Sequence, residues 1–403
     1  MLESMRVLDL TWVLGGPFAG QLLSQLGAEV IKVETPAGDP ARAIPPYMFE
    51  GDSSFFLSVN RGKSSVVIDL KNKKGLAAFY DLVKVSDAVI YSYAPDVPER
   101  LGIDYEQLRK INPRICVGQL IGLHDSDGYA RSPAYDLIAQ ALGGVMSITG
   151  QKGAPPSRVG YQVADLVGGA FLALATSSAL AGRTEKRGSR VQVSLLDCQL
   201  AMLAWQAQNY FISGVIPGPM GSRSPMTTPS EAFRAADGRY LAVSPTGTEF
   251  WQAFCRVLGM PEVAEDPRFT TRAARFDNVD ALSGLIAARI AERDSEEWLK
   301  LFAEARVPVA PVLNVAEAVN QPLAKLREMV ETVPHRRTGA TLEFLGNPFK
   351  YEGRQPLEYP PALGEDTQDV FRKLCGYSDE HIQELISAGA IGTGIGVRDN
   401  ETV

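Results

Sequence analysis

The sequence predicts an α/β protein in which a domain built on an open parallel sheet is followed by a second, smaller domain. Short apolar strands alternate with helices over the first 122 residues, and a stretch rich in Gly, Pro and Ser follows residue 211. The 403 residues are too many for one ordinary core, and 45% hydrophobic with 22% charged residues is typical of a globular protein. We therefore expect two or three domains.

The first part of the chain supplies the strands of the predicted sheet. "RVLDL" (6–10) leads through a Gly-rich turn into a helix over 18–26, with Pro17 in its first turn and Gly27 as its cap. "EVIKVE" (29–34) is the next strand, and such a strand–helix–strand unit predicts parallel strands with right-handed crossovers. Further strands are expected at 64–70, 87–93, 114–122 and 189–197.

An uncharged run from Leu166 to Gly182, bounded by Asp165 and Arg183, predicts a long helix. The run falls short of the ~20 residues that span a bilayer, and its Gly, Ala and Ser content suits close helix packing, so we expect a buried core helix. Residues 198–211 predict another helix. No secretory signal pattern opens the chain, and we expect a cytoplasmic protein.

The amino-acid composition changes in the middle of the chain. Residues 214–229 are rich in Gly, Pro and Ser and indicate a linker or an active-site loop. Asp237-Gly238 favours a β-hairpin, and Asp294 with Glu297 favours a capping box at a helix start. We expect a large domain over 1–215, a linker and small domain over 216–330, and a C-terminal part over 331–403.

Charge and cysteine content exclude several classes of function. A net charge of −7 argues against nucleic acid as the main partner. The four cysteines are far apart and form no C-x-x-C pair, and the three histidines show no helical spacing, so we expect reduced thiols and no metal site.

The first turn, Gly15-Gly16-Pro17-Phe18-Ala19-Gly20, is the first candidate for a ligand site. A Gly-rich turn that opens a helix can receive a phosphate, and Glu34 ends the second strand where a dinucleotide enzyme carries its ribose-binding acid. The spacing is G-G-P-x-x-G, however, and Pro17 removes one amide. The turn is therefore either a plain tight turn or a site for a different ligand.

Asp165 opens the long apolar helix, and two interpretations stay open on spacing alone. It is either an N-terminal cap, worth ~1 kcal/mol, or a carboxylate nucleophile held at a helix start. Tyr135 and Asp136 open another predicted helix, "AYDLIAQ". Asp136 is most simply a first-turn acid, and Tyr135 either donates a hydrogen bond to a ligand or packs in the core.

Basic residues in loops could bind an anionic ligand, although each alone is more simply a solvated surface charge. They are Lys32, Arg42, Arg61, Lys63, Arg100 and Arg131.

Long segments of the chain resemble the family III CoA-transferases, which include formyl-CoA, carnitine and bile-acid CoA-transferases and the related α-methylacyl-CoA racemases. The resemblance rests on "RVLDLTWVLGGPFAGQLLSQLGAEVIKVE", "PERLGIDYEQLRKINPRI", "AYDLIAQALGGVMSITG", "VADLVGGAFLALA", "GSRVQVSLLD" and "PPALGEDTQDV". It implies an interlocked homodimer whose Rossmann-like large domain is built from both chain ends, with a small domain from the middle. It also implies that Asp165 is the nucleophile and that CoA lies near Lys32, Thr35, Lys63, Tyr93 and Arg100.

The resemblance further implies a mechanism and a subclass. Asp165 would pass through an acyl anhydride and then an aspartyl-CoA thioester. The racemases carry a histidine where this chain has Tyr135, and the lack of that histidine favours transfer. Formyl-CoA transferases carry a glutamine where Leu14 stands, which speaks against a formyl/oxalate pair of substrates. Leu14, Met146 and the 214–229 loop are the candidates for the acyl pocket, and Leu14, Gly15, Tyr135 and Asp136 are the candidates for substrate contacts in the active-site loops.

We therefore predict a CoA-transferase that uses acyl-CoA and a small or medium carboxylate as substrates. It would need no tightly bound cofactor, nucleic acid or membrane. The alternatives are an acyl-CoA racemase or isomerase, a non-catalytic CoA-binding protein and, last, a NAD-dependent dehydrogenase.

Overall fold

The computed structural model describes residues 1–403 except 126–127, 130–131, 133 and 394–403. Arg131, one of the candidate basic residues, lies outside the described residues. The chain divides into two compact units. The large unit comprises Met1–Val145, Val159–Gly214 and Arg327–Val403, and the small unit comprises Met146–Arg158 and Val215–Leu326.

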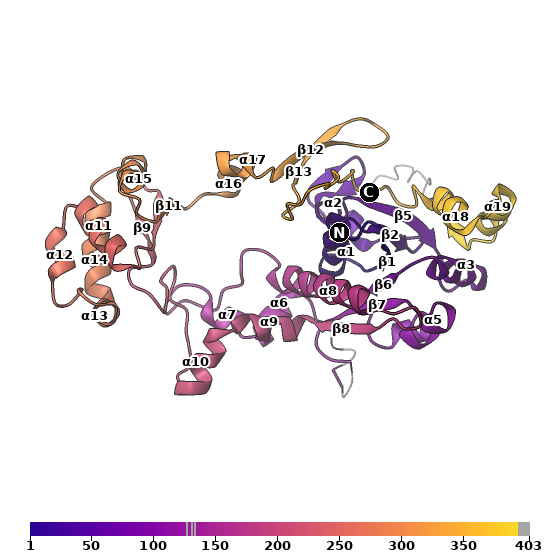
Figure 1. Ribbon diagram of the computed structural model, residues 1–403, viewed down its shortest axis with the longest axis horizontal. Coiled ribbons are helices and arrows are strands. Elements are labelled where there is room, and N and C mark those ends of the chain that lie inside the picture. The colour runs from indigo at the N-terminus through magenta and orange to yellow at the C-terminus, as the bar shows by residue number, and fades with distance from the viewer. Residues whose placement is uncertain (126–127, 130–131, 133, 394–403) are drawn as a thin grey trace. The chain divides into compact units, whose positions relative to one another are not determined.

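A seven-stranded sheet lies at the centre of the large unit (Figure 1). The strand order is β14–β5–β2–β1–β6–β7–β8, and all neighbours are parallel except β14, which pairs antiparallel with β5. The predicted α/β class with a large parallel sheet is thus confirmed. The strands are β1 (Arg6–Leu10), β2 (Glu29–Glu34), β5 (Lys63–Ile68), β6 (Ala88–Tyr91), β7 (Cys116–Ile121), β8 (Arg190–Ser194) and β14 (Ile391–Gly392).

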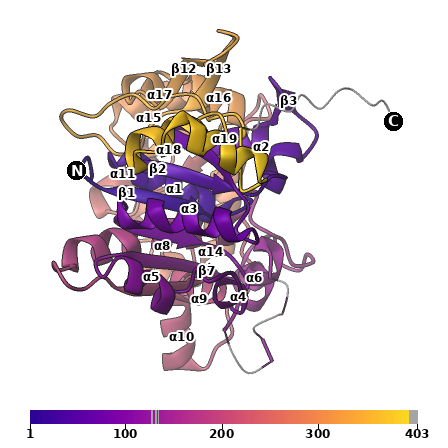
Figure 2. The same ribbon diagram turned by 90° about the vertical axis from the view of Figure 1, so that its right-hand side faces the viewer.

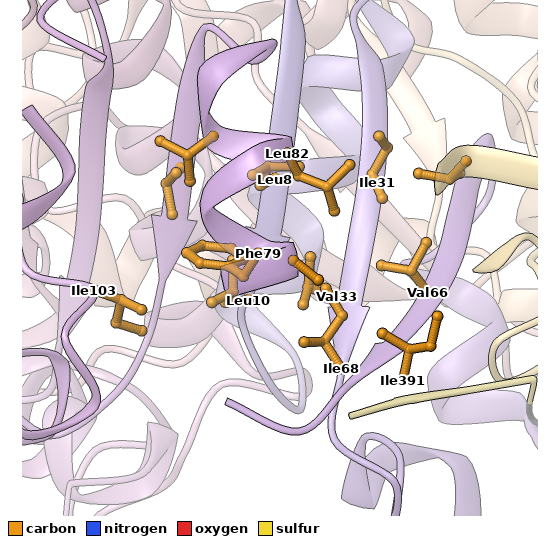
Figure 3. Close-up of a cluster of buried hydrophobic side chains, with 14 of the residues drawn as sticks. Leu8, Leu10, Ile31, Val33, Val66, Ile68, Phe79, Leu82, Ile103 and Ile391 are labelled. Carbon is orange, nitrogen blue, oxygen red and sulfur yellow. The ribbon is translucent and has the colours of Figure 1, made fainter. Parts of the chain in front are cut away.

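Helices cover both faces of this sheet. On one face lie α3 (Lys73–Lys84), α5 (Tyr105–Ile111), α18 (Thr367–Cys375) and α19 (Asp379–Ser387) (Figure 2). Figure 3 shows Phe79 and Leu82 of α3 among buried side chains of the strands, such as Leu8. On the other face, α1 (Gly15–Gln25) and α8 (Val163–Gly182) bury a second cluster that includes Val7. Leu8 and Val7 face opposite sides because side chains alternate along a strand.

The remaining elements of the large unit are short. They are η1 (Pro40–Ala43), β3 (Met48–Phe49), β4 (Asp52–Ser53), α2 (Ser54–Ser58), α4 (Val97–Leu101), α6 (Asp136–Leu142), α9 (Leu195–Leu203), α10 (Trp205–Ser213), β12 (Val330–Pro334) and β13 (Thr341–Leu345). One further helix, α7 (Val145–Ile148), begins at the last residue of this segment of the large unit.

Helix α8 is only half buried, which corrects the expectation of a fully buried core helix. One side packs against α1, β7 and β8 and includes Leu172 and Ala173. The other side exposes Phe171 and Leu174, the latter to 65%. Within the described part of the chain, α8 is the one helix whose length and apolar composition would suffice to cross a membrane. Length and composition alone are weak support for a membrane span, because a core helix passes the same test.

Two predicted elements differ from the structure around residue 195. The strand expected at 189–197 ends at Ser194, because the Ser194 hydroxyl caps a helix that begins at Leu195 and accepts a hydrogen bond from the Asp197 amide. The single helix expected over 198–211 is split into α9 and α10 at Ala204, whose φ of +43° leaves the helical region.

The small unit consists of a three-stranded antiparallel sheet and helices. Its elements are β9 (Glu231–Arg234), β10 (Tyr240–Val243), α11 (Thr248–Val257), α12 (Pro261–Glu265), α13 (Arg272–Asp277), α14 (Val279–Ile290), α15 (Ser295–Glu304), β11 (Val309–Pro311), α16 (Val315–Asn320) and α17 (Pro322–Leu326). The predicted hairpin through Asp237-Gly238 is confirmed as β9–β10. The predicted boundaries 1–215, 216–330 and 331–403 remain a prediction, since compactness does not by itself define folding domains.

The capping box predicted at Asp294 and Glu297 is wrong. Asp294 stands at the N-cap of α15 but makes no side-chain bond to the helix. The Ser295 amide and hydroxyl instead donate to Asp237 in the hairpin turn, at 3.1 and 2.6 Å.

Candidate active site

Asp165 lies in the first turn of α8, two residues after the helix starts at Val163. Burial raises the pKa of its carboxyl to about 7, and the nearby charge of Asp136 adds to this rise. No hydrogen bond to the Asp165 carboxyl is formed within the described residues. A capping aspartate would be hydrogen-bonded to the helix, so the geometry favours a reactive group over a cap.

The Gly-rich turn before α1 lies directly against the first turns of α8. A Cβ added at Gly15 would come within 2.8 Å of the Asp165 carbonyl oxygen, and one added at Gly169 would come within 2.2 Å of the Gly15 carbonyl oxygen. Glycine at these two positions therefore lets the backbones approach more closely than any side chain would permit. Leu14 is buried and stands at the N-cap of α1, so the predicted pair Leu14 and Gly15 lies beside Asp165.

The turn between β1 and α1 is held in a strained conformation. Val13 has a φ of +70°, which is rare for a β-branched residue. Its amide donates to Asp39 Oδ1 at 3.2 Å, and the Trp12 amide donates to the Ser92 hydroxyl at 3.0 Å. Strain of this kind persists where surrounding contacts enforce it, and it is found most often at functional sites.

Tyr135 and Asp136 lie at the start of α6 but in opposite environments. The Tyr135 side chain is 74% exposed, so the packed-core alternative for this residue is wrong. The Asp136 carboxylate is buried and accepts hydrogen bonds from the Ala164 amide at 2.9 Å and from Gln140 Nε2 at 2.7 Å. The structure therefore joins Asp136 to the residue that precedes Asp165.

Lys32 and Lys63, two of the predicted CoA-binding residues, are completely buried in a charge cluster under the turn. The Lys63 ammonium donates to Asp9 Oδ2, to the Pro17 carbonyl and to Asn60 Oδ1, each at 2.8 Å. A direct bond from this ammonium to a phosphate would require the cluster to rearrange, because all three of its donors are used. The CoA contact stays a prediction for both lysines.

Glu34 belongs to the same buried region and accepts four hydrogen bonds. The donors are the Asp39 amide, the Ser65 hydroxyl and two nitrogens of Arg42. Burial alone would raise the pKa of Glu34, but the bonds and charge of Arg42 outweigh it and lower the pKa to about 2. Both carboxylate oxygens of Glu34 are therefore occupied by protein donors, and neither is free to bind a ribose hydroxyl.

The interpretation of the loop lysines and arginines as solvated surface charges is wrong for four of them. Besides the two lysines, Arg61 is buried and donates to the carbonyl oxygens of Leu345 and Leu357 and to Glu331. Arg42 is nearly buried against Glu34. Arg61 and Arg42, which also donates to the Pro361 carbonyl oxygen, tie the C-terminal segment to the N-terminal part of the large unit, a role that no local sequence pattern indicates.

Thr35, Tyr93 and Arg100 follow the carboxyl ends of strands, where ligands bind to open parallel sheets. Thr35 and Tyr93 are partly buried, and the Tyr93 ring meets Trp12 edge-on at 5.6 Å. Arg100 is exposed, with its guanidinium 3.9 Å from Asp96.

A pocket of about 300 Å³ opens at this edge and brings Tyr93 and Tyr135 together. Its other lining residues follow β6 and β7 and include Ser92 and His124, neither of which is among the predicted site residues. The signal that could have found them is the strand-end rule, because Ser92 lies at the end of the strand predicted over 87–93 and His124 lies two residues after the strand predicted over 114–122. Met146 and residues 215–229, the other acyl-pocket candidates, belong to the small unit and remain predictions.

The described part of the chain contains no cluster of metal-ligating side chains and no disulfide. No group of three or more His, Cys, Asp or Glu lies close enough there to hold a metal ion. The four cysteines are unpaired.

Comparison with known proteins identifies the family. The family model described as CoA-transferase family III matches residues 2–367. An acetyl-CoA:oxalate CoA-transferase from Acetobacter aceti is 38% identical over 91% of this chain and 93% of its own length. A succinyl-CoA:glutarate CoA-transferase from Mus musculus is 32% identical over 97% and 90%.

A solved structure of a CAIB/BAIF family protein from Brucella suis superimposes with a TM-score of 0.81. It is 31% identical and covers 93% of this chain and 99% of its own. The resemblance stated from the sequence is confirmed. The chain belongs to CoA-transferase family III, and it is a CoA-transferase.

Proposed function

We propose that this enzyme transfers CoA from an acyl-CoA donor to a dicarboxylic acid, with Asp165 as the covalent nucleophile. The observation that carries the proposal is the Asp165 carboxyl, which is partly buried, has a pKa of about 7 and is not hydrogen-bonded by the described residues. A carboxylate in this state is more basic and less solvated than a surface aspartate, and both properties favour attack on a thioester. The dicarboxylate class is supported by the oxalate and glutarate of the two relatives.

The reaction would proceed through two covalent intermediates. An oxygen of Asp165 attacks the donor thioester carbonyl and the C–S bond breaks, which gives an aspartyl–acyl anhydride and CoA thiolate. The thiolate then attacks the Asp165 carbonyl carbon and releases the first acid, which leaves an aspartyl-CoA thioester. The acceptor carboxylate reverses these steps. Atoms and charge balance throughout without an external reactant.

The first turn of α1 offers hydrogen-bond donors for the oxyanions of these steps. The first amides of a helix have no intrahelical acceptor, and those of Gly15 and Gly16 point out of the start of α1, where the helix dipole also favours negative charge. Gly15 lies against the Asp165 backbone. We assign these two amides to oxyanion stabilisation, a role that preorganised donors commonly fill.

CoA would lie along the carboxyl edge of the sheet. Tyr93 and Tyr135 line the pocket at this edge, and Arg100 carries an exposed positive charge on α4, the helix that follows β6. Lys32 and Lys63 would act through the buried cluster that holds the turn before α1, since their ammonium groups are already paired with carboxylates.

We also propose that the enzyme is a cytoplasmic homodimer, with the interlocked arrangement and the Rossmann-like large domain that the family resemblance implies. Large apolar side chains are exposed along the helices of the large unit that follow Tyr135. They are Leu137, Ile138, Leu142, Phe171, Leu174, Leu200, Met202, Tyr210, Phe211 and Ile212. Exposed apolar residues in such number are typical of a protein–protein interface. Sedimentation analysis should give a dimer, and a monomer at micromolar concentration would contradict this part.

The test of the proposed function is a transfer assay with a panel of substrates. Acetyl-CoA and succinyl-CoA are offered as donors to oxalate, glutarate and a monocarboxylate control, and the new acyl-CoA is followed by chromatography. We expect parallel lines in double-reciprocal plots, which indicate a covalent enzyme form, and loss of transfer in Asp165→Asn. Transfer that survives in Asp165→Asn, or exchange of the α-proton of the acyl group without transfer, would contradict the proposal.

A further inference from the structure

Asp136 is linked to the chain on both sides of the start of α8. Its Oδ1 accepts from the Ala164 amide at 2.9 Å, and its Oδ2 accepts from Gln140 Nε2 at 2.7 Å. Gln140 in turn accepts from the Val159 amide through Oε1 at 3.0 Å. Asp136 and Gln140 are one turn apart on α6 and both are buried. A single pair of side chains therefore fixes the segment that leads into α8 and the first turn of α8 itself.

Helix α8 has no capping side chain of its own. Its N-cap residue, Gln162, makes no side-chain bond to the helix. The Ala164 amide is one of the first four amides, which have no acceptor within a helix, and Asp136 supplies that acceptor from another helix. The next residue after Ala164 is Asp165, so the hydrogen bond acts directly on the backbone that carries the nucleophile.

We propose that Asp136 is the positioning residue of the Asp165 nucleophile. It holds the first turn of α8 through the Ala164 amide. Its buried carboxylate also repels the charged form of Asp165 and so destabilises that form relative to the uncharged anhydride and thioester. This inference rests on the proposed covalent role of Asp165.

The arrangement has a consequence for the direction of the reaction. In the anhydride, CoA thiolate has two carbonyl carbons to attack. Attack at the Asp165 carbonyl breaks its bond to the bridging oxygen and sends the electron pair away with the substrate acid. Attack at the acyl carbonyl instead returns the Asp165 carboxylate to a place beside Asp136, where two negative charges repel each other. Asp136 therefore favours release of the first acid and formation of aspartyl-CoA.

Among the residues that the structure describes, no other charged group accounts for this effect. The pKa of Asp165 is raised by burial and by Asp136. Helix α1, packed against α8, carries no titratable residue. The titratable residues on the other elements packed against α8, none of which adds to the rise, are Cys116 on β7, Arg190 on β8, and Asp197 and Cys198 on α9.

A pair of variants separates the charge of Asp136 from its hydrogen bonds. Asp136→Asn keeps an oxygen for the Ala164 amide but turns an NH₂ group toward the NH₂ group of Gln140. Asp136→Asn/Gln140→Glu restores both bonds, because the new amide donates to the new carboxylate, whose other oxygen accepts from Val159. The double variant keeps these hydrogen bonds and moves the negative charge from residue 136 to residue 140, one turn along α6.

The experiment measures the fraction of enzyme converted to aspartyl-CoA by intact-protein mass spectrometry, with acetyl-CoA and succinyl-CoA as probes. For Asp136→Asn we expect the equilibrium constant for the adduct at pH 8 to fall about tenfold. We also expect the midpoint of adduct formation against pH to fall by about one unit. The double variant should lie between this variant and the wild type, and CoA affinity and unfolding by denaturant should show it to be folded.

Two outcomes would overturn the inference, and each differs from failure of the proposed function. If Asp136→Asn lowers the rate of adduct formation at every pH while the midpoint and the equilibrium constant stay unchanged, Asp136 is a structural residue only. If the double variant matches the wild type in both readouts, the charge beside Asp165 has no role. An adduct that persists in Asp165→Asn would instead contradict the proposed function.

Discussion

The close approach of α1 and α8 gives a sharp prediction for Gly169→Ala. The added Cβ would stand 2.2 Å from the Gly15 carbonyl oxygen, where ordinary contact begins at 3.4 Å, so the two backbones must separate by about 1 Å. Overpacking costs about 1–3 kcal/mol, and the better helix propensity of Ala returns about 1 kcal/mol. A displacement of about 1 Å at the nucleophile lowers the rate about 100-fold. We therefore expect a larger loss in rate than in stability.

The assay is the rate of adduct formation at Asp165, together with the free energy of unfolding from urea titration. Gly182→Ala is the matched control, because a Cβ at this last residue of the same helix meets nothing within 4 Å. Gly168→Ala is a second control, since the atoms nearest to its Cβ belong to the flexible side chains of Leu195, at 2.5 Å, and Leu120, at 3.3 Å, and not to the backbone. Equal rates for Gly169→Ala and Gly182→Ala would refute the claim that the site requires this approach of the two backbones.

Three further predictions concern stability. The pKa of Asp165 is raised from 3.8 to about 7, so the folded protein loses stability as pH rises through this range. At pH 8, the free energy of unfolding from urea titration should therefore be higher for Asp165→Asn than for wild type, by up to about 4 kcal/mol. Below pH 4 this difference should disappear. The pKa of Glu34 is lowered to about 2, so Glu34 contributes about 3 kcal/mol to the free energy of unfolding above pH 4.5, and this contribution is lost toward pH 2. Urea titrations should show the loss in wild type and in the exposed control Glu343→Gln, but not in Glu34→Gln. Lys63→Met should lower the free energy of unfolding by about 3–5 kcal/mol because Asp9 is left as a buried charge, and Asp9→Asn/Lys63→Met should recover most of it; a single variant as stable as wild type would contradict the buried pair.

The sheet could be predicted from the sequence because its signals are local. "RVLDL" and "EVIKVE" coincide with β1 and β2, since a strand buried on both faces is a short, nearly unbroken apolar run between turn residues. The position of Asp165 was equally accessible, because an acid at the start of a long uncharged run is conspicuous. Its chemical role came from resemblance, as a cap and a nucleophile give the same local pattern.

The environment of the site could not be predicted, because it depends on pairs of residues far apart in the chain. Lys63 meets Asp9 across 54 positions, and Asp136 meets Ala164 across 28. In the sequence, a completely buried lysine such as Lys63 cannot be told from a surface lysine until its partners are known. The capping box predicted at the start of α15 was wrong for the same reason, because Ser295 donates to an aspartate of the hairpin that is distant in the sequence.

The most direct test of covalent transfer through Asp165 is to map the adduct. Wild type, Asp165→Asn and Asp197→Asn, an exposed first-turn aspartate of the neighbouring helix, are each mixed with acetyl-CoA or succinyl-CoA, trapped with hydroxylamine and digested for mass spectrometry. We predict a CoA adduct and a hydroxamate on the peptide that carries Asp165 in wild type and Asp197→Asn, and neither in Asp165→Asn. An adduct on another residue, or turnover by wild type with no adduct on Asp165, would contradict the account.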